Sequence, residues 1–279
     1  MEFFSFWDGK PLTIYEELCL RSFEEHGFKI RLYSYNPNIA GNQIRVHPAD
    51  TILDEFTFSS FGHFASFSNH FRYCALNGAE SGSTWVDLDV LCLRPDWPKQ
   101  TFLAGFETRK RVNNAVLRIP RDTQLLQYLI QNSAIDDSSV YGATGPFLLT
   151  SGLDKYGKNF KLQPIKSFYP MGHWELDLLF DPEKLELAEA QFRNSYGLHL
   201  YNQLLVRAAI PKNVLPPAGS FLHQKFMTLM PQLKSSVTLG DEWLLGWSRN
   251  FHERRLLNRL GRHLGPLKSP LKRSLRLGI

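Results

Sequence analysis

The hydrophobic and polar positions at the start of the chain follow two different periods. Residues 3–7 form a short apolar run that Asp8-Gly9 ends, as expected of a strand. Residues 12–26 place apolar side chains at helical spacing, and Gly27 follows them as a helix stop. Residues 28–35 then alternate as a second strand. This strand–helix–strand order predicts the opening of a parallel α/β sheet.

The rest of the chain continues the alternation of helical and strand patterns. Residues 36–62 are less regular, residues 64–77 have helical spacing, and residues 84–93 read as one apolar strand. Beyond these, the pattern predicts strands at 102–106, 114–118 and 162–170, helices at 123–133 and 201–209, and a loop that leads into a helix over 142–157. We therefore expect one α/β domain, residues 1–242, with a mostly parallel central sheet flanked by helices.

Composition agrees with a globular body. The chain has 279 residues, 43% of them hydrophobic and 13% aromatic, which is enough for one full-sized core. The three cysteines lie in apolar runs without metal-ligand spacing, so they predict buried thiols in a reducing compartment and no disulfide framework. No window of about 18 apolar residues predicts a transmembrane helix, and the first residues do not resemble a secretory signal. Together these features predict a cytoplasmic protein.

The net charge of +5 is concentrated at the C-terminal end. From Arg249 onward the chain has nine Lys and Arg residues and a single acid, Glu253, so the preceding body is mildly acidic. A body without a basic patch does not fit a nucleic-acid-binding fold. Residues 243–279 are therefore predicted to be a basic amphipathic helical extension of the domain.

Two interpretations of this extension stay open. Its leucines recur at helical spacing and arginines flank them, so the helix could dock on the body with one solvated face. It could instead attach the protein to an anionic membrane surface, where each basic residue contributes about 1 kcal/mol.

Two aspartates, Asp87 and Asp89, interrupt the apolar run of residues 84–93. In a strand both carboxylates would lie on the same side of the backbone, at the carboxyl end where parallel sheets bind ligands. Neighbouring carboxylates raise each other's pKa unless a cation lies between them. A Mn²⁺ or Mg²⁺ ion that arrives with a substrate's diphosphate meets this need.

A pair of aspartates in this spacing also occurs without a metal–diphosphate ligand. An exposed pair at a turn or sheet edge is common, but the apolar flanks argue against it, because burying unpaired carboxylates costs several kcal/mol each. Haloacid-dehalogenase-type phosphatases carry two aspartates in the same spacing. They usually have Thr or Val four residues after the first one, where this chain has Leu91, and they place the motif on the first strand.

Residues 64–95 resemble the DXD region of a group of glycosyltransferases with the GT-A fold. The group includes α-1,4-galactosyltransferases, initiating α-mannosyltransferases and bacterial capsular or lipo-oligosaccharide transferases. Its pattern, roughly S-D-x-x-R-Y, a helix and G-G-x-[YW]-x-D-x-D, is matched by SNHFRY at 68–73 and GSTWVDLD at 82–89. Asn69 stands where the group usually has Asp, and Ser83 replaces a Gly. Weaker similarity at 6–35, 143–150, 168–170 and 197–203 extends the resemblance to roughly residues 3–205.

The resemblance implies a GT-A-like fold and assigns residues to three parts of a site. The metal ligands for Mn²⁺ or Mg²⁺ would be Asp87, Asp89 and His199. The donor-binding residues would be Phe6, Trp7, Gly9, Asn69, Arg72, Asp87, Leu88 and Asp89, with Arg72, Asp87 and Asp89 also acting in catalysis. The sugar or acceptor pocket would be formed by Asn113, Asn114, Thr144, Gly145 and Pro146.

Several of these residues also have a structural interpretation. Arg72 could be a surface arginine, although a guanidinium suits phosphate and hydroxyl groups. His199 could be structural, with His173 as a weaker rival for the metal. Trp7 could be a core residue, although its ring would suit a uracil base. Asn113 and Asn114 could simply form a turn.

The resemblance implies transfer of a hexose from a nucleotide sugar, most simply a UDP-sugar, to a saccharide or glycolipid acceptor. Retention of the anomeric configuration is expected. Bacterial surface polysaccharide or lipo-oligosaccharide synthesis would be the setting, with the basic extension at the inner face of the cell membrane. A non-catalytic nucleotide-sugar or glycan-binding relative is the alternative, and the intact aspartates argue against it.

Overall fold

The computed structural model describes residues 1–41, 44–59, 61, 63–134, 142–234, 236–240 and 242–247. The predicted basic part of the C-terminal extension lies outside these residues. Among the described helices, none is both long enough and apolar enough to cross a membrane. Cys19, Cys74 and Cys92 are all free thiols, as expected.

A six-stranded sheet runs through the molecule in the order β3-β2-β1-β4-β7-β6. The four strands from β3 to β4 are mutually parallel, β7 is antiparallel to β4, and β6 is antiparallel to β7. The bounds are β1 Glu2–Phe6, β2 Lys29–Ser34, β3 Val46–Pro48, β4 Thr84–Val86, β6 Leu103–Thr108 and β7 Arg111–Arg118. The expected α/β fold with a mostly parallel sheet is confirmed.

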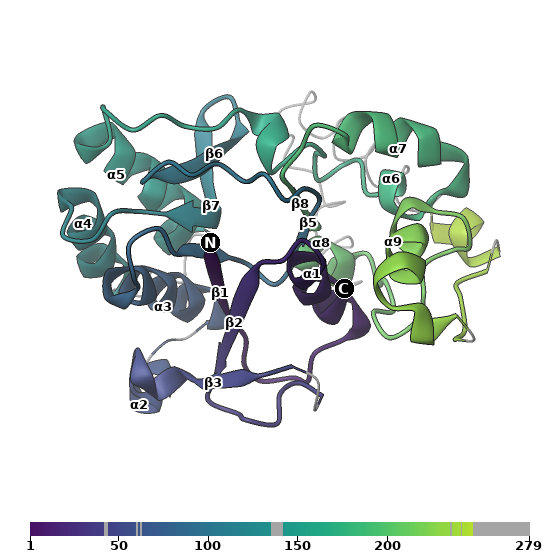
Figure 1. Cartoon of the computed structure of the whole chain (residues 1–279), viewed down its shortest axis with the longest axis horizontal. Coiled ribbons are helices and arrows are strands. Elements are labelled where there is room, and N and C mark those ends of the chain that lie inside the picture. The colour runs from purple at the N-terminus through teal and green to yellow at the C-terminus, as the bar shows by residue number, and fades with distance from the viewer. Residues whose placement is uncertain are drawn as a thin grey trace, which may run out of the picture.

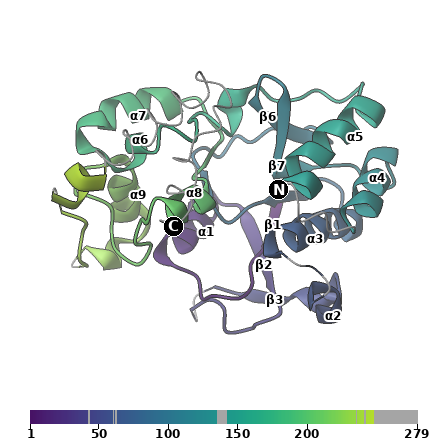
Figure 2. The ribbon, with the colours of Figure 1, turned by 180° about the vertical axis from the view of Figure 1, so that it is seen from behind.

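Helices cover both faces of this sheet (Figure 1), and the view from behind shows the same two layers (Figure 2). One layer holds α3, α4 and α5, and the other holds α1 with α9. The helices are α1 Ile14–Glu25, α2 Glu55–Ser59, α3 Phe64–Gly78, α4 Gln124–Ser133, α5 Leu148–Tyr156, α6 Asp177–Phe180, α7 Leu185–Phe192, α8 Asn202–Arg207 and α9 Phe221–Leu229.

The alternation of β1 explains how the two layers are held. Phe4 and Phe6 point into a core with Phe71 of α3, and the rings of Phe6 and Phe71 stack 4.4 Å apart. Phe3, on the opposite face, packs against Phe23 of α1 at 4.7 Å. A strand with apolar residues on both faces is expected where helices cover both sides of a sheet.

Residues 84–93 do not form one strand. β4 ends at Val86, and the Val90 N–H donates to the Asp87 carbonyl (3.0 Å), which closes a turn over the two aspartates. β5, Val90–Cys92, then pairs with β8, Gly197–His199, in a separate two-stranded sheet. The prediction that strand alternation places both carboxylates on one side is therefore wrong, and the turn positions them instead.

The strand predicted at 162–170 is also wrong. Gln163 makes one isolated bridge to Gly105, and Ile165–Ser167 is a 3₁₀ turn. Pro164 and Pro170 flank this segment, and proline cannot donate to a sheet ladder. The sequence pattern also misses several short elements: β3, α2, α6, α7, α9 and β8.

The predicted extension begins inside the described part of the chain. The rings of Trp243 and Trp247 stack 5.7 Å apart, and Trp247 lies 5.6 Å from Phe180 of α6. The start of residues 243–279 thus packs on the body. The domain boundary at residue 242 and the behaviour of the basic end stay predictions.

Candidate functional site

Asp87 lies directly after β4, where the parallel strands present their carboxyl ends. Its Oδ1 accepts hydrogen bonds from Arg72 Nη2 (2.7 Å) and Trp85 Nε1 (2.6 Å). Its backbone N–H donates to the Ala115 carbonyl of β7 (2.8 Å). Oδ2 receives neither side-chain bond, and the side chain is 29% exposed. Asp87 is thus fixed at one oxygen and accessible to a ligand.

Arg72 is a buried residue of α3 and not a surface arginine, with only 4% of its side chain exposed. Nη1 donates to the Asn114 carbonyl (2.8 Å), and the guanidinium lies 5.0 Å from the centre of the Trp85 ring. Helical spacing on α3 and the following strand β4 bring the three side chains together. The expected contact between Arg72 and the aspartate motif exists, through Asp87.

Asp89 and His199 form the other half of the site. His199 Nε2 lies 3.3 Å from Asp89 Oδ1, and the Asn202 N–H donates to Asp89 Oδ2 (2.7 Å). β5 and β8 are paired, and the Leu200 N–H donates to the Asp89 carbonyl (2.7 Å), which aligns the two segments. The imidazole is 10% exposed and the carboxylate 17%.

The pKa values of the two aspartates are shifted in opposite directions. Burial raises the pKa of Asp87, and the Arg72 guanidinium opposes that rise only in part. Burial would also raise the pKa of Asp89, but His199 and the Asn202 N–H outweigh it and lower this pKa to about 2. Burial would lower the pKa of His199, and Asp89 reverses this to a net increase. The ionised form is therefore stabilised more at Asp89 than at Asp87, and a cation beside Asp87 would lower the pKa of Asp87.

Asp87, Asp89 and His199 offer one ligand atom each, and these atoms all lie within 4.8 Å of one another. Among the described residues, these three form the group of His, Cys, Asp or Glu side chains that could hold a metal ion. His173 is not part of this group. Two carboxylates and an imidazole suit a divalent ion of the first transition row. His199 Nδ1 is buried without a hydrogen-bond partner among the described residues. The three residues expected as metal ligands are thus brought together.

Two of the expected sugar or acceptor residues join Asn69 in a buried polar network, and a third leaves room for it. Asn114 Nδ2 donates to Asn69 Oδ1 (2.9 Å) and to the Tyr73 hydroxyl (3.1 Å), and Asn69 Nδ2 donates to Thr144 Oγ1 (3.2 Å). A Cβ at Gly145 would lie 2.9 Å from Asn69 Nδ2. Asn69, which replaces the acid of the group pattern, thus uses both ends of its amide.

The other expected residues are spread between surface and core. Trp7 is half-buried after β1, and its Nε1 donates to the Lys10 carbonyl (2.8 Å). Gly9 has a φ of +93°, which favours glycine. The side chains of Phe6 and Leu88 are core residues, 3% and 4% exposed. Asn113 accepts the Ala115 N–H (2.8 Å), and Pro146 lies in the π-helical turn Ala143–Phe147.

The sequence did not predict the residues that support Asp89 through the Asn202 N–H. Asn202 follows Tyr201, whose φ of +55° is in the left-handed region. Lys212 Nζ donates to Asn202 Oδ1 (2.6 Å) and forms an ion pair with Glu16 of α1. The only sequence signal was the Thr13-x-x-Glu16 capping box at the start of α1, which explains Glu16 as a helix cap and not as a partner of Lys212.

Residues 122–215 match the family model described as the alpha 1,4-glycosyltransferase conserved region. The resemblance to this group is confirmed for a segment that holds Thr144, Gly145 and His199, although the two aspartates precede it. The chain is also similar to a solved structure named "PaToxG Glycosyltransferase", with 12% identity, a TM-score of 0.40, and coverage of 84% of this chain and 85% of that chain. At that level no residue or activity is transferred. No curated protein matches the chain significantly.

Proposed function

We propose that this protein is a metal-dependent glycosyltransferase that moves a hexose from a UDP-sugar to a saccharide acceptor. One observation carries the proposal: the ligand atoms of Asp87, Asp89 and His199 lie within 4.8 Å of one another, beside the buried guanidinium of Arg72. The match of residues 122–215 to the alpha 1,4-glycosyltransferase conserved region supports the class of reaction. The donor, the acceptor and the stereochemistry are proposed from the resemblance.

Mn²⁺ fits these ligands better than Mg²⁺, because Mg²⁺ prefers an octahedral shell of oxygen atoms and the site includes an imidazole. When bound, the ion would neutralise negative charge on the leaving diphosphate. Asp87, Asp89 and His199 would hold it. Asp87 and Asp89 come from one turn and His199 from β8, so the ligand set depends on the pairing of β5 with β8.

The residues around the ligands orient them and the substrates. Arg72 and Trp85 hold Asp87 at Oδ1, and Oδ2 receives neither of these bonds, so it would be available to the ion. The polar network of Asn69, Asn114 and Thr144 would position hydroxyl groups of the donor sugar or acceptor, because amide and hydroxyl side chains both donate and accept hydrogen bonds. Trp7 would cover the uracil ring. Retention, with the leaving phosphate assisting the acceptor, is our working mechanism.

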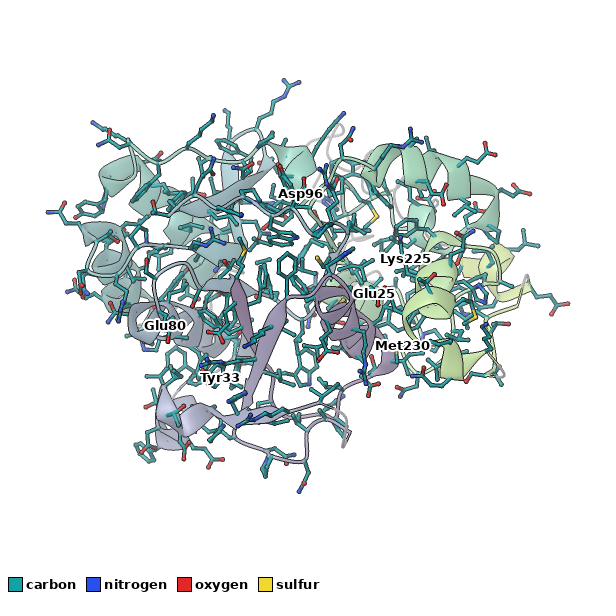
Figure 3. All side chains as sticks on the ribbon, viewed as in Figure 1. Glu25, Tyr33, Glu80, Asp96, Lys225 and Met230 are labelled. Atoms are coloured by element: carbon teal, nitrogen blue, oxygen red, sulfur yellow. The ribbon has the colours of Figure 1, made fainter. Side chains whose placement is uncertain are left out.

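UDP release tests this proposal. Purified protein is given UDP-galactose, UDP-glucose or UDP-GlcNAc with Mn²⁺ or with EDTA, and Asp89→Asn is compared with Asp96→Asn. Asp96 pairs with Arg94 at the exposed surface and is labelled in Figure 3. We expect metal-dependent release that Asp89→Asn abolishes and Asp96→Asn retains. If no donor is turned over but UDP-sugars still bind, the protein is a non-catalytic binding relative.

The setting is part of the proposal. Synthesis of a bacterial surface polysaccharide or lipo-oligosaccharide on the cytoplasmic side of the membrane would use the basic C-terminal end as a peripheral attachment. Truncation after Gly246 should move the protein from the membrane fraction to the supernatant. Trp247 packs on Phe180, so a second truncation after Arg249 serves as the control for lost core packing. Unchanged fractionation of both would support the docked-helix interpretation.

A further inference from the structure

A buried ion pair joins two distant parts of the chain directly behind Asp89. Lys212 follows α8, and Glu16 lies in the first turn of α1. Their side chains are 10% and 2% exposed, and they are in contact. A buried ion pair is costly in desolvation and is weak evidence for stability by itself. The position of this pair therefore points to a role beyond folding.

Lys212 makes a second contact that leads to the proposed metal site. Its Nζ donates to the side-chain oxygen of Asn202 (2.6 Å), and the N–H of the same residue donates to Asp89 Oδ2 (2.7 Å). The chain of contacts thus runs from Glu16 through Lys212 and Asn202 to Asp89. Each link is a direct contact between named atoms.

The backbone immediately before Asn202 is held in an unfavourable conformation. Tyr201, the preceding residue, has φ +55° and ψ +60°, a left-handed conformation that is uncommon outside glycine. Its hydroxyl donates to the Met171 carbonyl (3.2 Å), which fixes the ring end. Such a backbone persists only where the surroundings over-determine it. Lys212, through the Asn202 side chain, supplies the contact on the other side.

The ammonium group of Lys212 also lies near Trp7, the residue proposed to cover the uracil ring of the UDP-sugar. Lys212 Nζ is 5.9 Å from the centre of the Trp7 ring, within the range of a cation–π contact. One lysine therefore hydrogen-bonds the residue that supports Asp89 and lies within cation–π range of the aromatic ring that follows β1.

We propose that Lys212, held by Glu16, is a positioning residue that orients the Asn202 N–H toward Asp89 and fixes the Trp7 ring. It acts through these residues and is not a metal ligand. The inference rests on the proposed function for its consequence, since Asp89 matters there as a metal ligand. Groups that hydrogen-bond a ligating carboxylate typically change metal affinity or activity about 10- to 100-fold when they are removed.

The test compares four variants of the full chain: Lys212→Met, Glu16→Gln, the double variant Glu16→Leu/Lys212→Met, and Lys225→Met. Lys225 is the matched control, a partly buried lysine of α9 whose Nζ lies 5.2 Å from the centre of the Phe221 ring. Lys225 is labelled on α9 in Figure 3. The double variant removes the two buried charges together and leaves neither unpaired. It also removes the Glu16 acceptor of the Thr13 N–H, so circular dichroism must show that α1 is retained.

Mn²⁺ affinity is measured by calorimetry without donor, UDP affinity in EDTA, and the fold by circular dichroism. We expect Lys212→Met and the double variant to lose Mn²⁺ affinity about 10- to 100-fold. Glu16→Gln keeps the ammonium group but weakens its hold, so it should lose less Mn²⁺ affinity than Lys212→Met, and an unchanged affinity would contradict the role given to Glu16. We also expect a severalfold loss of UDP affinity in EDTA and no change in Lys225→Met. Recovery of Mn²⁺ affinity in the double variant would show that Lys212 merely neutralises Glu16, and would overturn the inference.

The outcomes separate this inference from the proposed function. If the wild-type protein binds Mn²⁺ and releases UDP while Lys212→Met binds Mn²⁺ equally well, only the inference fails. If the wild-type protein binds no Mn²⁺, the proposed function fails first. If Mn²⁺ affinity falls but UDP affinity in EDTA is unchanged, the part that concerns Trp7 is wrong.

Discussion

Arg72 reaches Asp87 from the preceding helix, with Nη2 2.7 Å from Oδ1, and the same guanidinium donates to the Asn114 carbonyl. A planar fork is needed to reach both acceptors, and a lysine offers one ammonium instead. Arg72→Lys should therefore lower metal-dependent UDP release about 10- to 100-fold. It should also reduce the free energy of unfolding by about 1–3 kcal/mol, because an acceptor loses its donor. Steady-state kinetics and urea unfolding measure the two effects.

Arg94→Lys is the control for this change. Arg94 pairs with Asp96, whose side chain is 57% exposed, and exposed pairs contribute at most about 1 kcal/mol. Equal losses in both variants would contradict a special role for Arg72.

Trp85 donates its indole N–H to the same oxygen of Asp87 (2.6 Å) and is fully buried beneath Arg72. Trp85→Phe keeps most of the apolar volume but removes this donor. We expect a loss of about 1–3 kcal/mol in unfolding free energy and a lower rate of UDP release. Trp97→Phe, a change of the same size at another buried tryptophan, should lower stability without a comparable loss in rate. If both variants lose activity in proportion to stability, the indole only fills space.

Gly145 leaves room for the Asn69 amide, because a Cβ there would lie 2.9 Å from Nδ2. Gly145→Ala should displace that amide from Thr144 and lower the unfolding free energy by about 1–3 kcal/mol. Donor or acceptor KM should rise as well. Gly78→Ala at the end of α3, where a Cβ meets nothing within 4 Å, should be neutral or slightly stabilising. A crystal structure of Gly145→Ala with Asn69 unmoved would refute the argument.

His70 gives a pH dependence of stability that can be isolated by mutation. Burial lowers its pKa below the usual 6.5, and Nδ1 lies 2.9 Å from the Ser133 hydroxyl. The unfolded chain therefore binds a proton at His70 before the folded chain does. The contribution of neutral His70 to the free energy of unfolding is fully present above pH 6.5 and is lost as the pH falls through the lower pKa of the folded state. Urea unfolding between pH 7.5 and about 5 should show a steeper decline for wild type than for His70→Gln; parallel curves would count against it.

The periodic parts of the chain could be predicted, because their pattern is local. The strand–helix–strand opening at 3–35 appeared as β1, α1 and β2. The helix over 64–77 appeared as α3, which placed Arg72 one turn from Asn69 and ahead of the aspartates. The grouping of Asp87, Asp89 and His199 came from the resemblance, since nothing local connects residue 199 with residue 87.

Long-range and backbone features could not be predicted. An apolar run such as 84–93 does not tell one strand from two strands that enter different sheets, because both bury the same side chains. Lys212 and Glu16 are both ordinary charges in the sequence, and only the fold brings them into contact. Tyr201 has a left-handed backbone, but it is neither glycine nor asparagine, so its residue type does not predict that conformation. These features all support Asp89.

The turn at Asp87–Asp89 also connects two separate sheets. It links the six-stranded sheet to the two-stranded sheet, and the third residue of the cluster, His199, belongs to the smaller sheet. Whatever occupies the cluster thereby fastens one sheet to the other. By linkage, a ligand bound to these three residues raises the free energy needed to separate β5 from β8. The increase equals the free energy that the pairing of β5 with β8 contributes to ligand binding. Backbone amide exchange in the small sheet would then report how full the site is.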